Sequence, residues 1–247
     1  MHDRTHLIEL RIDRFLRERL LPARYRASAP LTISAWEAPG EPVPFSQAAA
    51  APYLPFSVGQ AWGRAWGTTW FAVRGEVPAS WADAEGTRPE LVADLGFTAG
   101  QSGFQAEALV WRRDGTVVKG VSPFNTGVPG AVVAGSVDVL LEAASNPDVG
   151  SLFTFEPTAL GDRATAGEER IYRLRRLELG LLDVAVDELI ADVTVLRQLV
   201  DELDASSPRR AELVEGLDRL VDAVDPHDVA GTAAAGRAVL APLLASP

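Results

Sequence analysis

The sequence lacks cysteine and has few histidines and lysines. None of the 247 residues is Cys, three are His (His2, His6 and His227), and Lys119 is the single lysine. Without cysteine there can be no disulfide, no thiol nucleophile and no thiolate metal ligand. Because an absence of disulfides is typical of the cytoplasm, we expect a cytoplasmic protein.

A basic surface and a long apolar run are missing as well. The formal net charge is −11, whereas surfaces that bind nucleic acid or anionic membranes need clustered basic residues. The start, Met-His-Asp-Arg-Thr-His, leads into an arginine-studded amphipathic stretch, and no run reaches the roughly 18 apolar residues of a membrane span. We therefore predict neither nucleic acid nor membrane as a partner.

The residues needed for a metal or catalytic site are also scarce. His2 and His6 have the spacing of helical metal ligands, but a zinc site needs three or four ligands in a shaped pocket. Neither a phosphate-binding loop nor a dinucleotide fingerprint occurs, and no Ser-His-Asp set can be assembled. The acids Glu90, Asp94 and Glu107 are scattered. We predict no metal site, no cofactor and no catalytic residue in this chain.

The residues that are present, 47% of them hydrophobic, suffice for a sizeable core. We predict an α+β protein, mainly β: an antiparallel β-sandwich with an N-terminal helix and a C-terminal segment of about three helices. The expected parts are an N-terminal helix and arm (1–30), the sandwich (31–160) and a helical linker (161–247). The first helix runs from an N-cap at Thr5 to about Leu21, and an irregular, proline-rich segment continues to about Pro55.

Between Thr68 and Phe155 the apolar residues recur with a period of two, and turn signals come about every ten residues. The clearest signal is Asp114-Gly115, which predicts a hairpin. Seven strands are expected: Thr68–Arg74, Leu91–Phe97, Phe104–Arg112, Thr116–Val121, Ala131–Val133, Val137–Ala144 and Ser151–Phe155.

After Gly161 apolar residues recur at helical spacing. The pattern predicts a long helix from about Glu168 to Leu203. A second helix begins at Ser207-Pro208, an N-cap followed by a first-turn proline, and a third begins near Thr232. Their apolar faces must be covered by the sandwich or by a partner. The long helix also permits a homo-oligomer.

One stretch is unusually rich in tryptophan: Gly59-Gln-Ala-Trp-Gly-Arg-Ala-Trp-Gly-Thr-Thr-Trp-Phe71. Its three glycines disfavour a helix, and strand alternation places Trp66, Thr68, Trp70 and Ala72 on one face, with Phe71 and Val73 on the other. Indole rings stack on sugars, so Trp62, Trp66 and Trp70, with Arg64, are candidate carbohydrate-binding residues. Packing in the core or against another domain is the alternative that we favour.

Several motifs together resemble a known family. They are Gly59 to Phe71, Val77-Pro78 with Trp81, Gly103 to Trp111, Asp114-Gly115, Lys119-Gly120, Leu141 to Pro147, Tyr172 to Arg176 and Asp228 to Thr232. The chain resembles, over essentially its whole length, the N-terminal region of cytosolic-type α-mannosidases of glycoside hydrolase family 38.

The resemblance implies a non-catalytic part of an enzyme that removes terminal α-mannose. In that family a β-sandwich and a helical linker precede a zinc-dependent catalytic domain, which opens with a His-x-Asp motif. The present sequence ends at Pro247 without that motif, so the zinc ligands and nucleophile map onto no residue here. We therefore expect the chain alone to be inactive, with the catalytic domain as its partner and zinc held there. A free-standing carbohydrate-binding module is the alternative.

Overall fold

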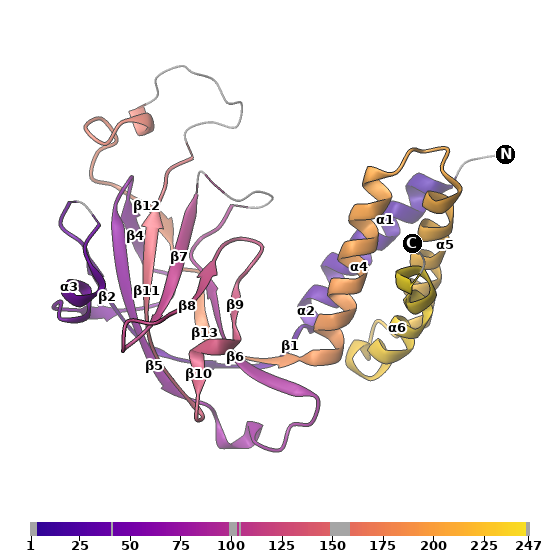
Figure 1. Cartoon of the computed structure of the whole chain (residues 1–247), viewed down its shortest axis with the longest axis horizontal. Coiled ribbons are helices and arrows are strands. Elements are labelled where there is room, and N and C mark those ends of the chain that lie inside the picture. The colour runs from indigo at the N-terminus through magenta and orange to yellow at the C-terminus, as the bar shows by residue number, and fades with distance from the viewer. Residues whose placement is uncertain (1–3, 41, 99–102, 104, 149–158, 246–247) are drawn as a thin grey trace. The chain divides into compact units, whose positions relative to one another are not determined.

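A computed structural model describes residues 4–40, 42–98, 103, 105–148 and 159–245. The chain divides into two units. The β unit comprises Ser28–Asp83 and Pro89–Gly180, and the helical unit comprises Met1–Ala27, Ala84–Arg88 and Leu181–Pro247. The predicted class, mainly β with an antiparallel sandwich, an N-terminal helix and three C-terminal helices, is confirmed (Figure 1).

The largest sheet of the β unit has seven strands, and its pairings are antiparallel. In spatial order they are β3 (Leu54–Phe56), β2 (Thr32–Glu37), β5 (Thr68–Glu76), β11 (Ser136–Ser145), β7 (Ala106–Arg112) and β8 (Val117–Val121), with β10 (Val132–Val133) paired to β11. The hairpin predicted at Asp114-Gly115 joins β7 to β8, and the Asp114 carboxylate accepts a hydrogen bond from the Thr116 amide at 2.8 Å.

The remaining strands form two smaller sheets. The four-stranded sheet has the order β1 (Tyr25–Pro30), β13 (Arg176–Asp183), β6 (Thr87–Asp94), β9 (Gly127–Val128), and the two-stranded sheet pairs β12 (Arg170–Arg173) with β4 (Ala61–Arg64). One apolar core joins all three sheets and makes the sandwich. It takes Phe71, Val73, Val110, Val139 and Leu141 from the seven-stranded sheet, Leu91, Val128, Leu177 and Leu179 from the four-stranded sheet, and Trp62 and Tyr172 from the two-stranded sheet.

The opposite, outer face of the seven-stranded sheet has a second, smaller core. Trp70, Ala72 and Leu140 lie there beside Ala48 of the short helix α3 (Phe45–Ala49). The predicted alternation along the strand from Thr68 is therefore confirmed, because Trp70 and Ala72 lie on one face and Phe71 and Val73 on the other. Single 3₁₀ turns lie at Ala79–Trp81, Pro129–Ala131 and Ala159–Gly161.

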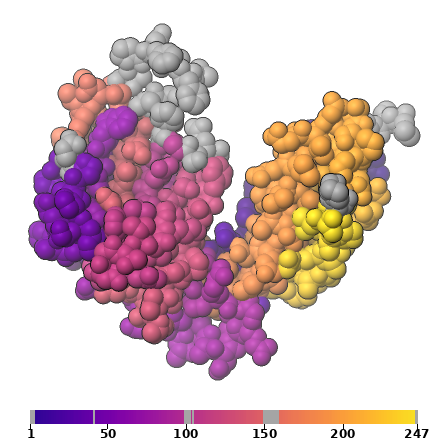
Figure 2. All heavy atoms as spheres, in the orientation of Figure 1, coloured from indigo at the N-terminus to yellow at the C-terminus, as the bar shows by residue number. Residues whose placement is uncertain are grey.

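The helical unit contains α1 (Thr5–Phe15), a π-helical turn at Leu16–Leu20, α2 (Leu21–Ala23), α4 (Val184–Glu202), α5 (Pro208–Ala223) and α6 (Val229–Ala245). The helices share one core, to which α1 contributes Ile12 and Phe15. The apolar faces of the three C-terminal helices thus pack against one another and against α1. Their atoms form the orange-to-yellow surface in Figure 2.

Helix starts follow the local chemistry. Ser207 caps α5, as predicted, and its hydroxyl accepts a hydrogen bond from the Arg210 amide at 3.4 Å. The first helix begins after Arg4, so the N-cap predicted at Thr5 is wrong. None of the described helices combines the length and the low polarity that crossing a membrane requires.

The long helix predicted from Glu168 is wrong in its first half. Residues 170–173 and 176–183 form β12 and β13, and α4 begins only after Asp183, whose buried side chain accepts a hydrogen bond from the Val186 amide at 3.0 Å. Leu177, Leu179 and Leu181 are buried at a spacing of two, which is the period of a strand. The leucines that follow have helical spacing. Because α4 begins directly after β13, no break in the sequence separates the strand pattern from the helical pattern.

The proline-rich segment predicted to be irregular also holds strands. β1 and β2 lie within it and β3 lies at its end, so that prediction is wrong for these stretches. The strand predicted at Ser151–Phe155 lies outside the described residues.

Candidate functional site

The tryptophan-rich segment consists of β4, a tight turn and the start of β5. The turn needs unusual backbone angles: φ is 70° at Gly63 and 64° at Trp66, a value that bulky residues rarely adopt. A Cβ atom at Gly63 would lie 2.5 Å from the Cβ atom of Ser145. Glycine is therefore required at position 63 by both its angle and its surroundings.

Ser145 of β11 holds this turn. Its carbonyl accepts a hydrogen bond from the Trp66 amide at 3.0 Å, and its amide donates to the Gly67 carbonyl at 3.0 Å. Its buried hydroxyl lies against the carbonyls of Arg64 and Gly67. The strained conformation of Trp66 is thus fixed by partners from a distant strand, and a strained residue held in this way is often functional.

The three tryptophans do not form one row. Trp62 is 1% exposed, donates its Nε1–H to the Leu95 carbonyl at 2.8 Å, and stacks on Tyr172 with ring centroids 5.4 Å apart. Trp70 is fully buried in the outer-face core, with Phe45 and Trp111 as its ring neighbours. Core packing, the favoured alternative, describes both of these indoles, because neither presents a ring face to solvent.

Trp66 differs from the other two. It lies outside the strands, 38% of its surface is exposed, and its Nε1–H donates to the Leu160 carbonyl at 2.8 Å. This hydrogen bond fixes the indole while part of the ring stays accessible. Of the predicted carbohydrate-binding residues, Trp66 and Arg64 are therefore the most exposed, whereas the buried Trp62 lines a hollow.

Arg64 belongs to a charged cluster. Its Nε–H donates to Glu37 at 2.5 Å, its Nη1–H donates to Glu168, and Arg170 donates to the second oxygen of Glu37 at 3.1 Å. The hydrogen bond to Glu168, followed by the one to Glu37, raises the pKa of Arg64. Two guanidinium groups and two carboxylates neutralise one another, so we infer an orienting role for the cluster rather than proton transfer.

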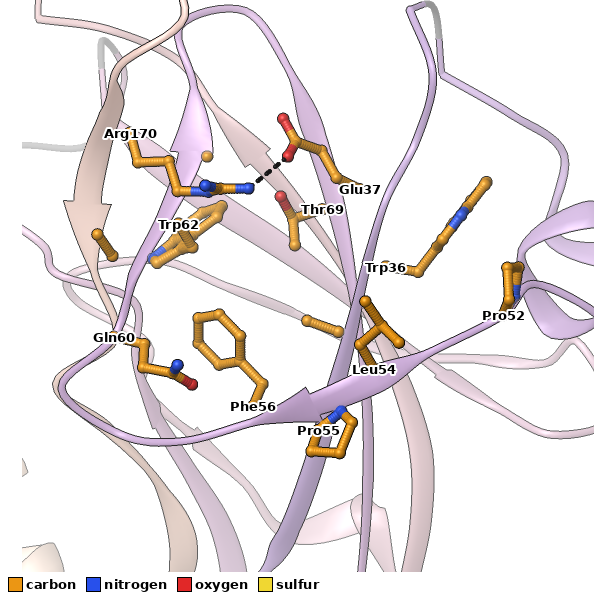
Figure 3. Close-up of a pocket in the computed structure, with 13 residues that line it drawn as sticks. Trp36, Glu37, Pro52, Leu54, Pro55, Phe56, Gln60, Trp62, Thr69 and Arg170 are labelled. Carbon is orange, nitrogen blue, oxygen red and sulfur yellow. Dashed lines mark hydrogen bonds and ion pairs between the residues drawn. The ribbon is translucent and has the colours of Figure 1, made fainter.

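A hollow of about 350 Å³ lies beside this cluster (Figure 3). Leu54, Pro55 and Phe56 of β3 form an apolar side, and the Glu37–Arg170 pair lies at its polar end. Thr69 also lines the hollow; it is 4% exposed, and its hydroxyl has no hydrogen-bond partner among the described residues. An apolar cavity with a few polar groups can hold a small polar ligand or a side chain of another protein.

Two of the three histidines lie in the described part of the chain. His6 on α1 and His227 before α6 are both exposed, and His2 lies outside the described residues. Within the part of the chain that the structure describes, no three His, Asp or Glu side chains gather as metal ligands would.

Sequence reasoning missed Glu37, Thr69, Ser145 and Arg170. Ser145 lies almost 80 residues from its partners in the turn, and nothing in the local pattern signals that contact. Arg170 was hidden by the helix predicted over β12. Glu37 follows the apolar run of β2, where a strand prediction would have directed attention to it.

A comparison with family models finds one match, described as alpha-mannosidase, jelly roll domain, over residues 29–180. The match covers more than half of the chain and nearly coincides with the β unit. No curated protein matches the chain.

Proposed function

Because the chain belongs to the alpha-mannosidase jelly roll domain family, we propose that it is a non-catalytic N-terminal part of an α-mannosidase of the family 38 type. The parent enzyme would remove terminal α-D-mannose from oligosaccharides in the cytoplasm, with zinc held in its catalytic domain. The family match over residues 29–180 is the observation that carries this proposal. The motifs from Gly59 to Phe71 and from Leu141 to Pro147 support the more specific family.

An activity assay tests the non-catalytic role. The purified chain, incubated with an aryl α-mannoside and either zinc or cobalt, should release no aryl alcohol. Hydrolysis that follows the chain through successive purification steps would contradict the proposal. An α-mannosidase of the same type, assayed in parallel, shows that the conditions support turnover.

We further propose that the chain packs against the catalytic domain through the surface around Trp66. A half-exposed indole in a strained turn is a rigid apolar anchor, and such residues carry much of the energy of protein interfaces. The neighbouring Glu37–Arg64–Glu168 cluster would supply the polar rim. A homo-oligomer is a separate expectation, which light scattering over a range of concentrations tests.

Binding to an α-mannosidase catalytic domain from the same genome tests this surface. Trp66→Ala should weaken the complex about tenfold or more, as removing a central aromatic anchor does. Phe124→Ala is the matched control, because Phe124 is also in the β unit and is 70% exposed. Equal effects of both variants, with the fold retained by circular dichroism, would show that Trp66 is not the anchor.

A second candidate is a carbohydrate-binding module. It is favoured by the hollow beside Arg170 and by the accessible ring of Trp66. Thr69, which lines the hollow, has a buried hydroxyl with no partner among the described residues. Titration with mannose oligosaccharides should give a saturable change in tryptophan fluorescence that Trp66→Ala reduces. An unchanged spectrum at saturating sugar would leave packing as the role of this segment.

A further inference from the structure

A polar row crosses the outer face of the seven-stranded sheet. Thr32 of β2 pairs with Arg74 of β5, which pairs with Asp138 of β11, and Arg113 directly follows β7. Arg74 and Arg113 donate their Nε–H groups to the same oxygen of Asp138, at 3.1 and 2.5 Å. One carboxylate therefore lies between two guanidinium groups, which leaves a positive charge on a chain whose net charge is −11.

A hollow of about 260 Å³ adjoins the row. Its cations are Arg74 and Arg113, its hydroxyl groups belong to Thr32, Ser34 and Tyr53, and its remaining walls are Ala49, Ala51 and Ala72. No carboxylate is among these lining residues. The small alanine side chains keep the space open, and the polar groups are chiefly hydrogen-bond donors.

Two of these donors have no acceptor among the described residues. They are the hydroxyl of Tyr53 and Nη2 of Arg113, and both atoms are buried. Burial raises the pKa of Tyr53 to about 12, so its hydroxyl keeps its proton at neutral pH. Buried donors without acceptors are costly, and both side chains line the adjoining hollow.

We propose that this hollow binds a small oxyanion, a phosphate group in particular. A tetrahedral anion supplies several acceptor oxygens, and guanidinium groups are the side chains best suited to bind them. The phosphate could be the free ion or the monoester of a small metabolite, since both offer the same oxygens. The site lies on the outer face of the sheet, and its argument does not depend on the proposed mannosidase role.

Titration with inorganic phosphate, followed by amide NMR, tests the site. At constant ionic strength the amide signals of Thr32, Ser34, Arg74 and Arg113 should move saturably, whereas chloride should leave them in place. A linear drift without saturation, or shifts spread over the whole surface, would mean that phosphate acts only as a general salt and would overturn the proposal.

Three substitutions sharpen the test. Arg113→Gln and Arg74→Gln should each weaken phosphate binding about tenfold or more, because each removes charge-assisted hydrogen bonds. Asp138→Asn should strengthen binding, because it removes the carboxylate that competes for both guanidinium groups. Arg19→Gln, an exposed arginine of the helical unit, is the matched control for charge.

The exposed Arg74 keeps the test decisive if the more buried Arg113→Gln fails to fold. Weakening by Arg19→Gln equal to that by Arg74→Gln, or weakening by Asp138→Asn, would overturn the site. A phosphorylated hexose and the same hexose without phosphate distinguish the two sources of the group. Tighter binding of the ester than of free phosphate identifies a metabolite, equal binding identifies the free ion, and binding of the unphosphorylated sugar in this hollow contradicts the proposal.

Discussion

The β unit and the helical unit bury their residues in different ways. Among the described residues, the polar side chains buried in the β unit are Thr68, Thr69, Glu90, Gln105 and Ser145, whereas in the helical unit only Asp183 is buried, as the cap of α4. Within the described part of the chain, two non-glycine residues have a positive φ, Trp66 and Ala134, and both lie in the β unit. Of these residues, Trp66, Thr69 and Ser145 belong to the candidate site around the tryptophan-rich turn, so irregular backbone and buried polar groups coincide there.

The largest expected effect compares the two cores. Trp62→Ala should cost about 3–5 kcal/mol of unfolding free energy, because it leaves a large cavity and an unpaired Leu95 carbonyl. Leu217→Ala, at a fully buried position of α5, should cost about 2–5 kcal/mol. Denaturant unfolding and amide exchange measure both. Val195→Ala, on the exposed face of α4, is the control. If Trp62→Ala lost no more unfolding free energy than Val195→Ala, the prediction for the sandwich core would be contradicted.

The next largest expected effect is the change in stability when alanine replaces a tightly packed glycine of either unit. Gly63→Ala should lose about 1–2 kcal/mol through its left-handed backbone and about 1–3 kcal/mol more through overpacking against Ser145. In Gly216→Ala of α5 the new methyl meets only the end of the Leu243 side chain, and the gain in helix propensity of about 1 kcal/mol offsets part of the cost.

Gly59→Ala separates backbone strain from overpacking. Its φ is 91°, but no atom of the described residues lies within 4 Å of the added methyl group, so the variant should show strain alone. Urea unfolding should therefore rank Gly63→Ala as the most destabilised of the three. If Gly59→Ala equals Gly63→Ala, close packing against Ser145 is not what requires glycine in this turn.

Local patterns predicted much of the fold, and distant contacts account for most of the errors. The hairpin at Asp114-Gly115 and the cap at Ser207 are set by neighbouring residues, and both predictions are confirmed. The strands β1, β3 and β4 are short and rich in proline, glycine or polar residues, and they are stabilised by pairing with partners far along the chain. No local period identifies such strands.

The candidate site shows the same limit. Strand alternation placed Trp66 on one face with Trp70, but the left-handed backbone at Trp66 breaks the alternation between β4 and β5. Trp62 and Trp70 therefore lie in different cores. That break depends on Ser145, whose role could not be deduced without the register of β11 against β5.

A smaller effect concerns Tyr172 of the sandwich core. Burial raises its pKa to about 12, so the neutral phenol is favoured in the folded state. This contribution to stability is complete below the ordinary pKa of about 10 and is lost as the pH rises through the folded value.

Tyr172→Phe should remove one phenol that titrates near pH 12, as followed by ultraviolet absorbance. It should also cost about 1 kcal/mol, because the hydrogen bond from the Tyr172 hydroxyl to the Asn146 carbonyl is lost. Tyr53→Phe should remove a second such phenol, and a Tyr172 that titrates near 10 would show that its ring is not buried.

The smallest expected effect is a change in stability at acid pH, compared for one ion pair in each unit. Burial raises the pKa of Asp138, but hydrogen bonds from Arg113 and Arg74 outweigh it, so the folded pKa is lowered. The stabilisation is present above the unfolded pKa of about 4 and is lost as the pH falls through the folded value.

Because Asp138 is half exposed, Asp138→Asn should cost at most about 1 kcal/mol at neutral pH and should flatten the loss of stability below pH 4. Glu215→Gln, in the exposed pair with Arg219 on α5, should change stability by less than about 0.5 kcal/mol. Equal acid profiles for the two variants would show that the polar row on the sheet is no better organised than an ordinary surface pair, and the contrast between the units would then rest on their cores alone.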